Sequence, residues 1–298
     1  MLSLFDTAKR ILKSFFAERH LLGDDNLFSI DNILSSTKIE ALVMAIDKGI
    51  KKDYDKVLKS VNKEVRSKLK NEYNQFIKKG VFRTAPSLQK YKIEDLKPDF
   101  KKELESRINV SLSYIKTQDQ NTIEEIKNRL MNFASIPHPN KDLKELEYDF
   151  WNDVIPAKVK KNYKTSSWQN MIIRDQQHKL VSNMTYITAM KNDAIGFIWK
   201  NRKDIRVVGN PSGLYPSGNK MHNDHWKREG KLYLFRNSAA LKKGLIKKTK
   251  DVQYADEIED GLPGIPINCR CTMRLIYRLY EIPAEYKNII TQKGKELS

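Results

Sequence analysis

The sequence predicts an α+β protein, with a mainly α-helical first half followed by a small α+β module that contains a short antiparallel sheet. In the first part, up to residue 165, apolar side chains recur at three- and four-residue steps, the spacing of helices with one buried face. From Ser166 onward, short β-like runs alternate with loops rich in glycine and proline. This change of pattern predicts a boundary between two domains near residue 165.

The first domain, residues 1–165, is expected to be built from helices. Apolar residues at helical spacing predict one long helix, or two in line, from Ser36 to Gly80, where glycine ends the pattern. Residues 81–100 contain two prolines and are expected to form a connector. Two shorter helices are expected at 101–117 and 121–133. Their apolar faces are typical of the core of a helical bundle.

The second domain, residues 166–280, is expected to begin with a helix over 166–191 and to continue as a small antiparallel sheet. Strand patterns occur at four places: 196–200, 205–208, 231–235 and 272–280. Residues 281–298 are left as a C-terminal tail.

Charge and cysteine content limit the classes of function. The chain has 298 residues, with 55 Lys+Arg against 37 Asp+Glu and a net charge of +18. Such a surface attracts polyanions, so we expect non-specific electrostatic contact with DNA. Two cysteines in a chain of this length exclude a secreted scaffold built from disulfides.

The first residues show no targeting signal and no membrane span. Apolar residues between Met1 and Phe16 form a helical stripe interrupted by charged side chains, whereas a secretory signal needs an unbroken apolar core. No run approaches the ~20 apolar residues that a membrane-spanning helix needs. We expect this helix to dock on a partner protein or on the chain itself.

Scarce metal-binding residue types are concentrated between residues 222 and 271. His222 and His225 open this stretch, and Cys269 and Cys271, the chain's two cysteines, close it. Two imidazole nitrogens and two thiolates form a tetrahedral zinc site in many proteins, so these four residues are candidate ligands of a structural zinc ion. The alternative is that the cysteines are small buried hydrophobic residues and that the histidines are solvated.

The same stretch resembles the phage Mu F-like minor head proteins, also called phage head morphogenesis proteins. The resemblance covers roughly residues 166–280. The residues that carry it, in chain order, are Arg174, Asp175, Trp199, Asp204, Arg206, His225, Gly230, Pro263, Gly264, Asn268, Cys269, Arg270 and Cys271. Ile267 departs from the pattern, because the family commonly has histidine two residues before the first cysteine.

The resemblance implies a minor capsid protein of a tailed phage that acts in viral assembly. Its partners would be the portal protein, with scaffold and major capsid protein as further candidates, and DNA contacted through the basic surface. It would lie in the virion, in the capsid interior at the portal vertex, and in the host cytoplasm during assembly. Residues 1–165 would dock on the portal or another partner, and the His/Cys cluster would pin residues 166–280 into a compact body.

An enzyme acting on nucleic acid or nucleotides is the alternative. Asp204, Asp224 and Glu229 with the two histidines have the residue types of a toxin-related metal-dependent nuclease. Arg174, His225 and Glu229 have the residue types of a toxin-related nucleotide transferase. No catalytic residue is assigned, because carboxylates are common in any polar loop. For Arg174 we prefer an ion pair that ties the helix to a loop.

Overall fold

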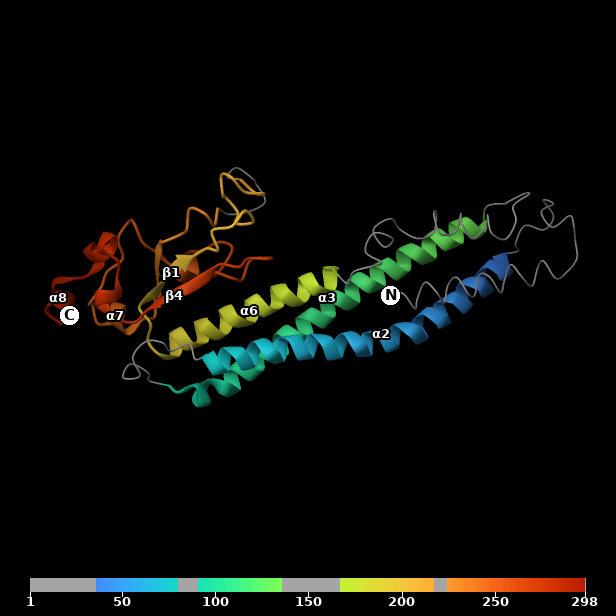
Figure 1. Cartoon of the computed structure of the whole chain (residues 1–298), viewed down its shortest axis with the longest axis horizontal. Coiled ribbons are helices and arrows are strands. Elements are labelled where there is room, and N and C mark those ends of the chain that lie inside the picture. Colours follow the sequence, from blue (N-terminus) through green and yellow to red (C-terminus); the bar gives the residue numbers. More distant parts are fainter. Residues whose placement is uncertain (1–35, 80–90, 136–166, 217–223, 298) are drawn as a thin grey trace, which may run out of the picture. The chain divides into compact units, whose positions relative to one another are not determined.

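The computed structural model describes residues 36–79, 91–135, 167–216 and 224–297 (Figure 1). It has the predicted α+β class, with helices mainly in the first half and a small four-stranded sheet in the second. These residues form two compact units. The helical unit contains residues 36–65, 111–135 and 167–172, and the sheet unit contains residues 66–79, 91–110, 173–216 and 224–297. Both units therefore take segments from each side of residue 165.

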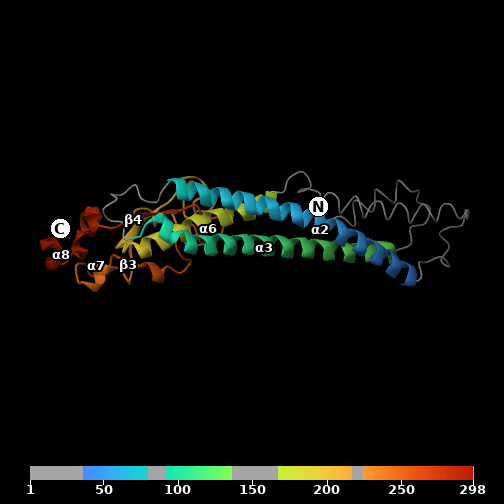
Figure 2. The same cartoon turned by 90° about the horizontal axis from the view of Figure 1, so that it is seen from below.

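Two long helices supply the first half of the chain. Helix α2 spans Ser36–Lys79, which confirms the long helix predicted there. Helix α3 spans Ile93–Ser135 without interruption, so the prediction of two separate helices, and of a connector up to residue 100, was wrong (Figures 1 and 2). In the helical unit these helices bury Tyr54, Val61 and Ile115.

The start of α3 explains why the proline in it does not break the helix. Lys92 N donates to Asp95 Oδ2 at 2.9 Å, which caps the first turn. Pro98 lies in the second turn, so the N–H that it lacks would have served only the carbonyl of Glu94. A proline this close to a helix start costs less than one in the interior, and the sequence pattern alone overstated its effect.

In the sheet unit, segments of α2 and α3 pack with helix α6, which spans Ser167–Lys191 as predicted. The buried apolar residues of these segments are Leu69, Leu96, Phe100, Leu104, Ile108, Ile173, Leu180 and Met184. Polar contacts join the same segments: Gln177 Nε2 donates to the Lys68 carbonyl, and Asn183 Nδ2 donates to Glu103 Oε1. No described helix combines the length and the apolar character that a membrane crossing needs.

The sheet has the strand order β3-β2-β1-β4. Strand β1 (Gly196–Lys200) pairs antiparallel with β2 (Leu232–Leu234) on one side and with β4 (Thr272–Ile276) on the other. Strand β3 (Gln253–Tyr254) pairs parallel with β2. The sheet is therefore mixed, whereas the sequence predicted an antiparallel one, because a two-residue strand leaves no pattern to read.

Alternate residues of β1 enter two different cores. Phe197 and Trp199 join the core that includes Ala189 of α6 and both cysteines. Ile198 joins the other core, with Leu232 and with residues that follow in the chain. One face of the sheet therefore supports the candidate metal ligands.

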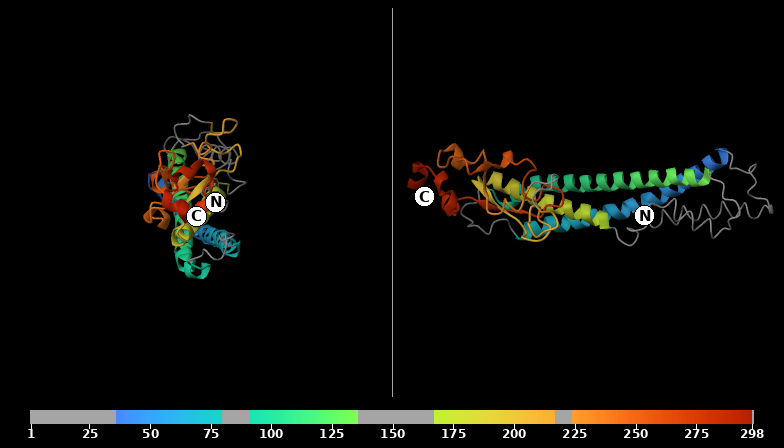
Figure 3. Two further views of the ribbon diagram at one scale, coloured as in Figure 1. Left: turned by 90° about the vertical axis from the view of Figure 1, so that its left-hand side faces the viewer. Right: turned by 90° about the horizontal axis from the view of Figure 1, so that it is seen from above.

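The second core holds the end of the chain against the sheet. It includes Ala240 of the short helix α7 (Ala239–Lys242) together with Ile282, Ile289 and Ile290. The last elements are the 3₁₀ helices η4 (Leu279–Glu281) and η5 (Ala284–Ile289) and helix α8 (Gln292–Glu296) (Figure 3). Residues 281–297, which the sequence leaves as a tail, are thus part of the sheet unit.

One predicted strand, residues 205–208, is a series of turns. Asp204 Oδ1 accepts from Arg206 N at 2.9 Å, and Val207 N donates to the Asp204 carbonyl at 3.1 Å. This side-chain capture of the backbone competes with strand pairing and explains why the β-branched run did not form a strand.

Candidate metal centre

The candidate centre is formed by two chain segments that lie next to β1 and β4. His225 precedes a turn in which Gly230 N donates to the Trp199 carbonyl, and this bond holds the segment against the end of β1. Cys269 and Cys271 directly precede β4. Turns place them there: Cys269 N donates to the Pro266 carbonyl at 3.0 Å.

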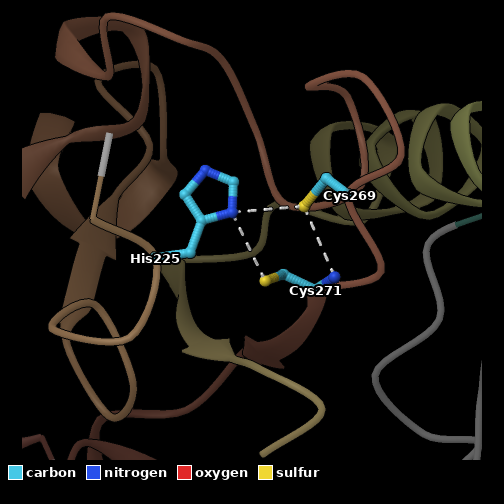
Figure 4. A group of neighbouring side chains, drawn as sticks. All are labelled: His225, Cys269 and Cys271. Atoms are coloured by element: carbon cyan, nitrogen blue, oxygen red, sulfur yellow. Dashed lines mark hydrogen bonds between the residues drawn. The ribbon is translucent and has the colours of Figure 1, made fainter. Parts of the chain in front are cut away.

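Three metal-binding side chains converge in this place (Figure 4). His225 Nδ1 lies 3.5 Å from Cys269 Sγ and 3.8 Å from Cys271 Sγ. The three ligand atoms lie within 4.8 Å of one another, and all three residues are buried. His225, Cys269 and Cys271 therefore form a group that could hold a metal ion.

Backbone geometry prepares Cys269 for a negative charge. Its Sγ accepts from Gly264 N and from Cys271 N, each at 3.4 Å. Gly264 has a φ of 86° and Asn268 a φ of 56°, so the turn that aims these groups uses the left-handed region twice. N–H groups directed at sulfur stabilise a thiolate, which is the form that binds metal.

The two thiols differ in acidity. A hydrogen bond with Cys271 and the neighbouring His225 lower the pKa of Cys269 well below its ordinary value, although burial acts in the opposite direction. The neighbouring Cys269, together with burial, raises the pKa of Cys271, while Trp199 and Arg228 act in the opposite direction. Without a cation, one thiolate is stable here and the second is not. A bound metal cation would stabilise both, which fits this donor set.

A carboxylate orients the histidine from behind. His225 Nε2 lies 2.7 Å from Asp260 Oδ2, and Arg228 NH1 donates to Asp260 Oδ1 at 2.6 Å. Burial would raise the pKa of Asp260, but these two hydrogen bonds lower it to about 2. Burial would lower the pKa of His225, but its bonds to Asp260 and Cys269 raise it to about 9.

Asp260 and Arg228 were not found by sequence reasoning. Asp260 is one of several acids in a short stretch, and nothing in that stretch distinguishes it. In metalloproteins a ligating histidine commonly donates its other ring N–H to a carboxylate, and this contact sets the tautomer. Arg228 also lies over the Trp199 ring at 4.8 Å, and the His225 ring contacts the same indole edge-on at 5.2 Å.

Other residues of the predicted motif tie the cysteine segment to its surroundings. Asp175 is buried on α6 and accepts from Asn268 N at 2.7 Å. Ser182, also on α6, donates to the Pro263 carbonyl at 2.5 Å. The side chain of Arg270, between the two cysteines, pairs with Asp204. These contacts hold the segment at both ends.

Some predicted site residues lie elsewhere. Arg174 is exposed on α6. The contact between helix and loop that was expected of Arg174 is made by the neighbouring Asp175, which accepts from Asn268 N. Arg206 is exposed in the turn after Asp204. His222 lies outside the described residues, so its place as a ligand stays a prediction.

Asp224 and Glu229, which the sequence suggested for a nuclease or transferase site, contact other residues instead. Asp224 accepts from Lys227 N, and Glu229 accepts from Asn201 N at 2.6 Å and pairs with Lys200. Among the residues that the structure describes, neither of them joins the group formed by His225 and the cysteines.

Comparisons of the chain with protein-family models, with curated proteins and with solved structures find no match.

Proposed function

We propose that this chain is a minor head protein of a tailed phage, of the Mu F-like kind, in which a zinc ion fastens two distant loops into a rigid body. The observation that carries the proposal is the convergence of His225 Nδ1 on both sulfurs of the Cys-x-Cys pair, at the end of the motif that resembles this family.

The chemistry of the donors supports zinc. One imidazole nitrogen and two thiolates are soft or borderline ligands that suit zinc better than magnesium or calcium. His225 is separated from Cys269 and Cys271 by 44 and 46 positions, so an ion bound to all three closes a long loop of chain. We assign His222 as the fourth ligand because it lies three residues before His225.

A structural role is supported by what surrounds the ligands. Both cysteines and His225 are buried, and the N–H and carboxylate groups next to them are directed at the ligands. His225, Cys269 and Cys271 would hold the zinc ion, and its binding would contribute free energy that keeps the two segments together. The rigid body would associate with the portal protein, the helices of residues 1–165 would provide the docking surface, and the basic surface would contact packaged DNA.

Metal analysis tests the centre. We expect one zinc per purified chain, lost in Cys269→Ser and in His225→Ala, and weakened in His222→Ala. His178→Ala is the matched control, because His178 is a half-buried histidine of the same unit outside this group. Wild-type protein that contains no metal after purification with added zinc would refute the proposal that zinc joins the two segments.

Association with the portal tests the assignment. A tailed-phage portal protein co-expressed with this chain should co-purify with the wild type in the presence of nuclease, which removes DNA bridges. Failure to associate, with or without DNA, would refute the assignment to a minor head protein even if zinc is present.

A further inference from the structure

Two lysine-rich segments that are distant in the sequence are joined in space at one end of the sheet unit. They are residues 239–250, which include α7, and residues 284–297, which include η5 and α8; we call them together the lysine lobe (Figures 1 and 2). They contain eight lysines and two glutamates, so they carry a third of the net charge of +18 in less than a tenth of the chain.

The joint between the segments is a set of backbone contacts. Lys247 N donates to the Ile289 carbonyl at 2.8 Å, and Thr291 N donates to the Leu245 carbonyl at 3.0 Å. Gly294 fits so closely that a Cβ there would lie 2.2 Å from the Leu245 carbonyl oxygen. Below these contacts Ile246 is buried in the second core of the sheet. The lysines are therefore carried by a fixed scaffold.

Most of the positive charge in the lobe is not neutralised. Lys248 pairs with Glu257 at 2.8 Å, and Lys293 Nζ donates to the Lys243 carbonyl, a contact that leaves its charge uncompensated. Lys287 Nζ likewise donates to backbone carbonyls, those of Leu279 and Tyr280. Further exposed lysines of the lobe for which the described residues provide no carboxylate partner are Lys242, Lys243, Lys247 and Lys250.

We propose that the lysine lobe is the surface through which this chain holds the phosphate backbone of double-stranded DNA without reading its base sequence. Choosing DNA as the polyanion rests on the proposed function. The lobe has eight lysines and no arginine; lysine is a flexible point charge that lacks the planar fork with which arginine makes bidentate contacts. Contacts of this kind position a protein on DNA without sequence preference.

An anionic membrane fits the lobe less well. A surface that binds bilayers combines cations with an exposed apolar face. Within the described residues of the lobe, Leu297 is the one large apolar side chain that is exposed, and the isoleucines Ile246, Ile289 and Ile290 are buried. A second copy of this strongly basic chain is disfavoured as the occupant by like-charge repulsion.

The test measures how affinity for a 30-base-pair duplex of mixed sequence, a length chosen as roughly three helical turns, depends on salt. Log affinity falls with log salt in proportion to the number of phosphates contacted. The variant Lys242→Gln, Lys243→Gln, Lys247→Gln, Lys250→Gln should reduce the slope by about 2 to 4 and the affinity at moderate salt by about 10-fold or more. The control variant Lys70→Gln, Lys79→Gln, Lys101→Gln, Lys102→Gln removes the same charge from exposed helix positions and should change affinity by less than about 3-fold.

A second variant tests the juxtaposition without changing charge. Gly294→Val places a side chain against the Leu245 carbonyl and should separate the two segments. We expect reduced DNA affinity with an unchanged far-UV spectrum. Wild-type affinity in both this variant and the quadruple lobe variant, or an equal loss in the lobe and control quadruple variants, would overturn the proposal. So would binding to phosphatidylserine vesicles that depends on the lobe while DNA binding does not. None of these results affects the zinc and portal assays, so the two proposals fail separately.

Discussion

His225 uses its two ring nitrogens for different contacts. Nδ1 faces both sulfurs, and Nε2 lies 2.7 Å from the Asp260 carboxylate. The carboxylate favours a proton on Nε2, so Nδ1 is the nitrogen that would give up its proton to bind a metal ion. Arg228 neutralises the carboxylate from its other side at 2.6 Å. The affinity of the centre should therefore depend on residues that do not touch the ion.

Asp260→Asn is the direct test of this orientation. Removing the negative charge behind the imidazole should weaken zinc binding by about 10- to 100-fold, measured by competition with a chromogenic chelator. Asp256→Asn is the control, because Asp256 lies in the same stretch but is exposed and pairs with Arg236. Equal affinity in the two variants would mean that Asp260 only supports the fold.

A second residue of interest is Asp119, a buried acid in the helical unit. It is 1% exposed, and its Oδ1 has no hydrogen-bond partner. Burial raises the pKa of Asp119 to about 6 from its ordinary value of 3.8. The protonated form is thus favoured in the folded chain. The contribution of protonated Asp119 to the stability of the fold is fully present below pH 3.8, and it is lost as the pH rises through about 6.

Asp119→Asn should therefore remove the free-energy cost of ionising a buried carboxyl group, a cost that grows with pH. The difference in unfolding free energy between variant and wild type should grow between pH of about 4 and about 7, reaching about 3 kcal/mol in favour of the variant. Denaturant titrations followed by far-UV circular dichroism measure it. Asp55→Asn, which removes a carboxylate at an exposed position of α2, is the control. A constant difference at all pH values would contradict the raised pKa.

At the scale of elements, α6 holds the cysteine segment through its buried face. Asp175 accepts from Asn268 N and pairs with Lys179 at 2.7 Å, and Ser182 holds the Pro263 carbonyl. Asn268 and Gly264 both have positive φ, so the loop needs this support to keep its shape. The helix therefore acts as the frame on which the two cysteines are placed.

Asp175→Ala should lower the free energy of unfolding by about 2 to 4 kcal/mol, because it leaves the Lys179 charge and the Asn268 N–H without their acceptor. Arg174→Ala, one position away on the exposed face, should change it by less than about 0.5 kcal/mol. Urea denaturation of both variants provides the comparison. A larger loss of unfolding free energy in Arg174→Ala than in Asp175→Ala would contradict this assignment and support the ion pair that the sequence analysis expected at Arg174.

At the scale of the whole molecule, a metal ion would join the segment of His225 to the segment of Cys269 and Cys271. The cores on the two faces of the sheet are formed by residues that include parts of β1, α6, α7 and the end of the chain. Trp199 of β1 is fully buried and its ring contacts the His225 ring, so it reports on the centre. Because α2 and α3 are long, most of the far-UV helical signal comes from residues outside the metal centre.

Chelation of zinc should therefore shift Trp199 fluorescence to longer wavelength while the far-UV helical signal is largely retained. Trp199→Phe identifies the contribution of this residue against the other tryptophans. Addition of zinc should reverse the change. Loss of the helical signal together with the fluorescence would instead mean that the chain unfolds as one unit on losing the metal.

The sequence by itself determined the α+β class, the long helix α2, helix α6, strand β1 and three of the candidate ligands, because apolar periodicity and residue type are local properties. It did not determine that α3 is continuous, that residues 205–208 are turns, or that the sheet is mixed, because local capping and partner strands decide these. Only the tertiary structure brought Asp260 to His225 and joined the lysine segments. Such contacts depend on chain folding over tens of residues, and no spacing in the sequence encodes them.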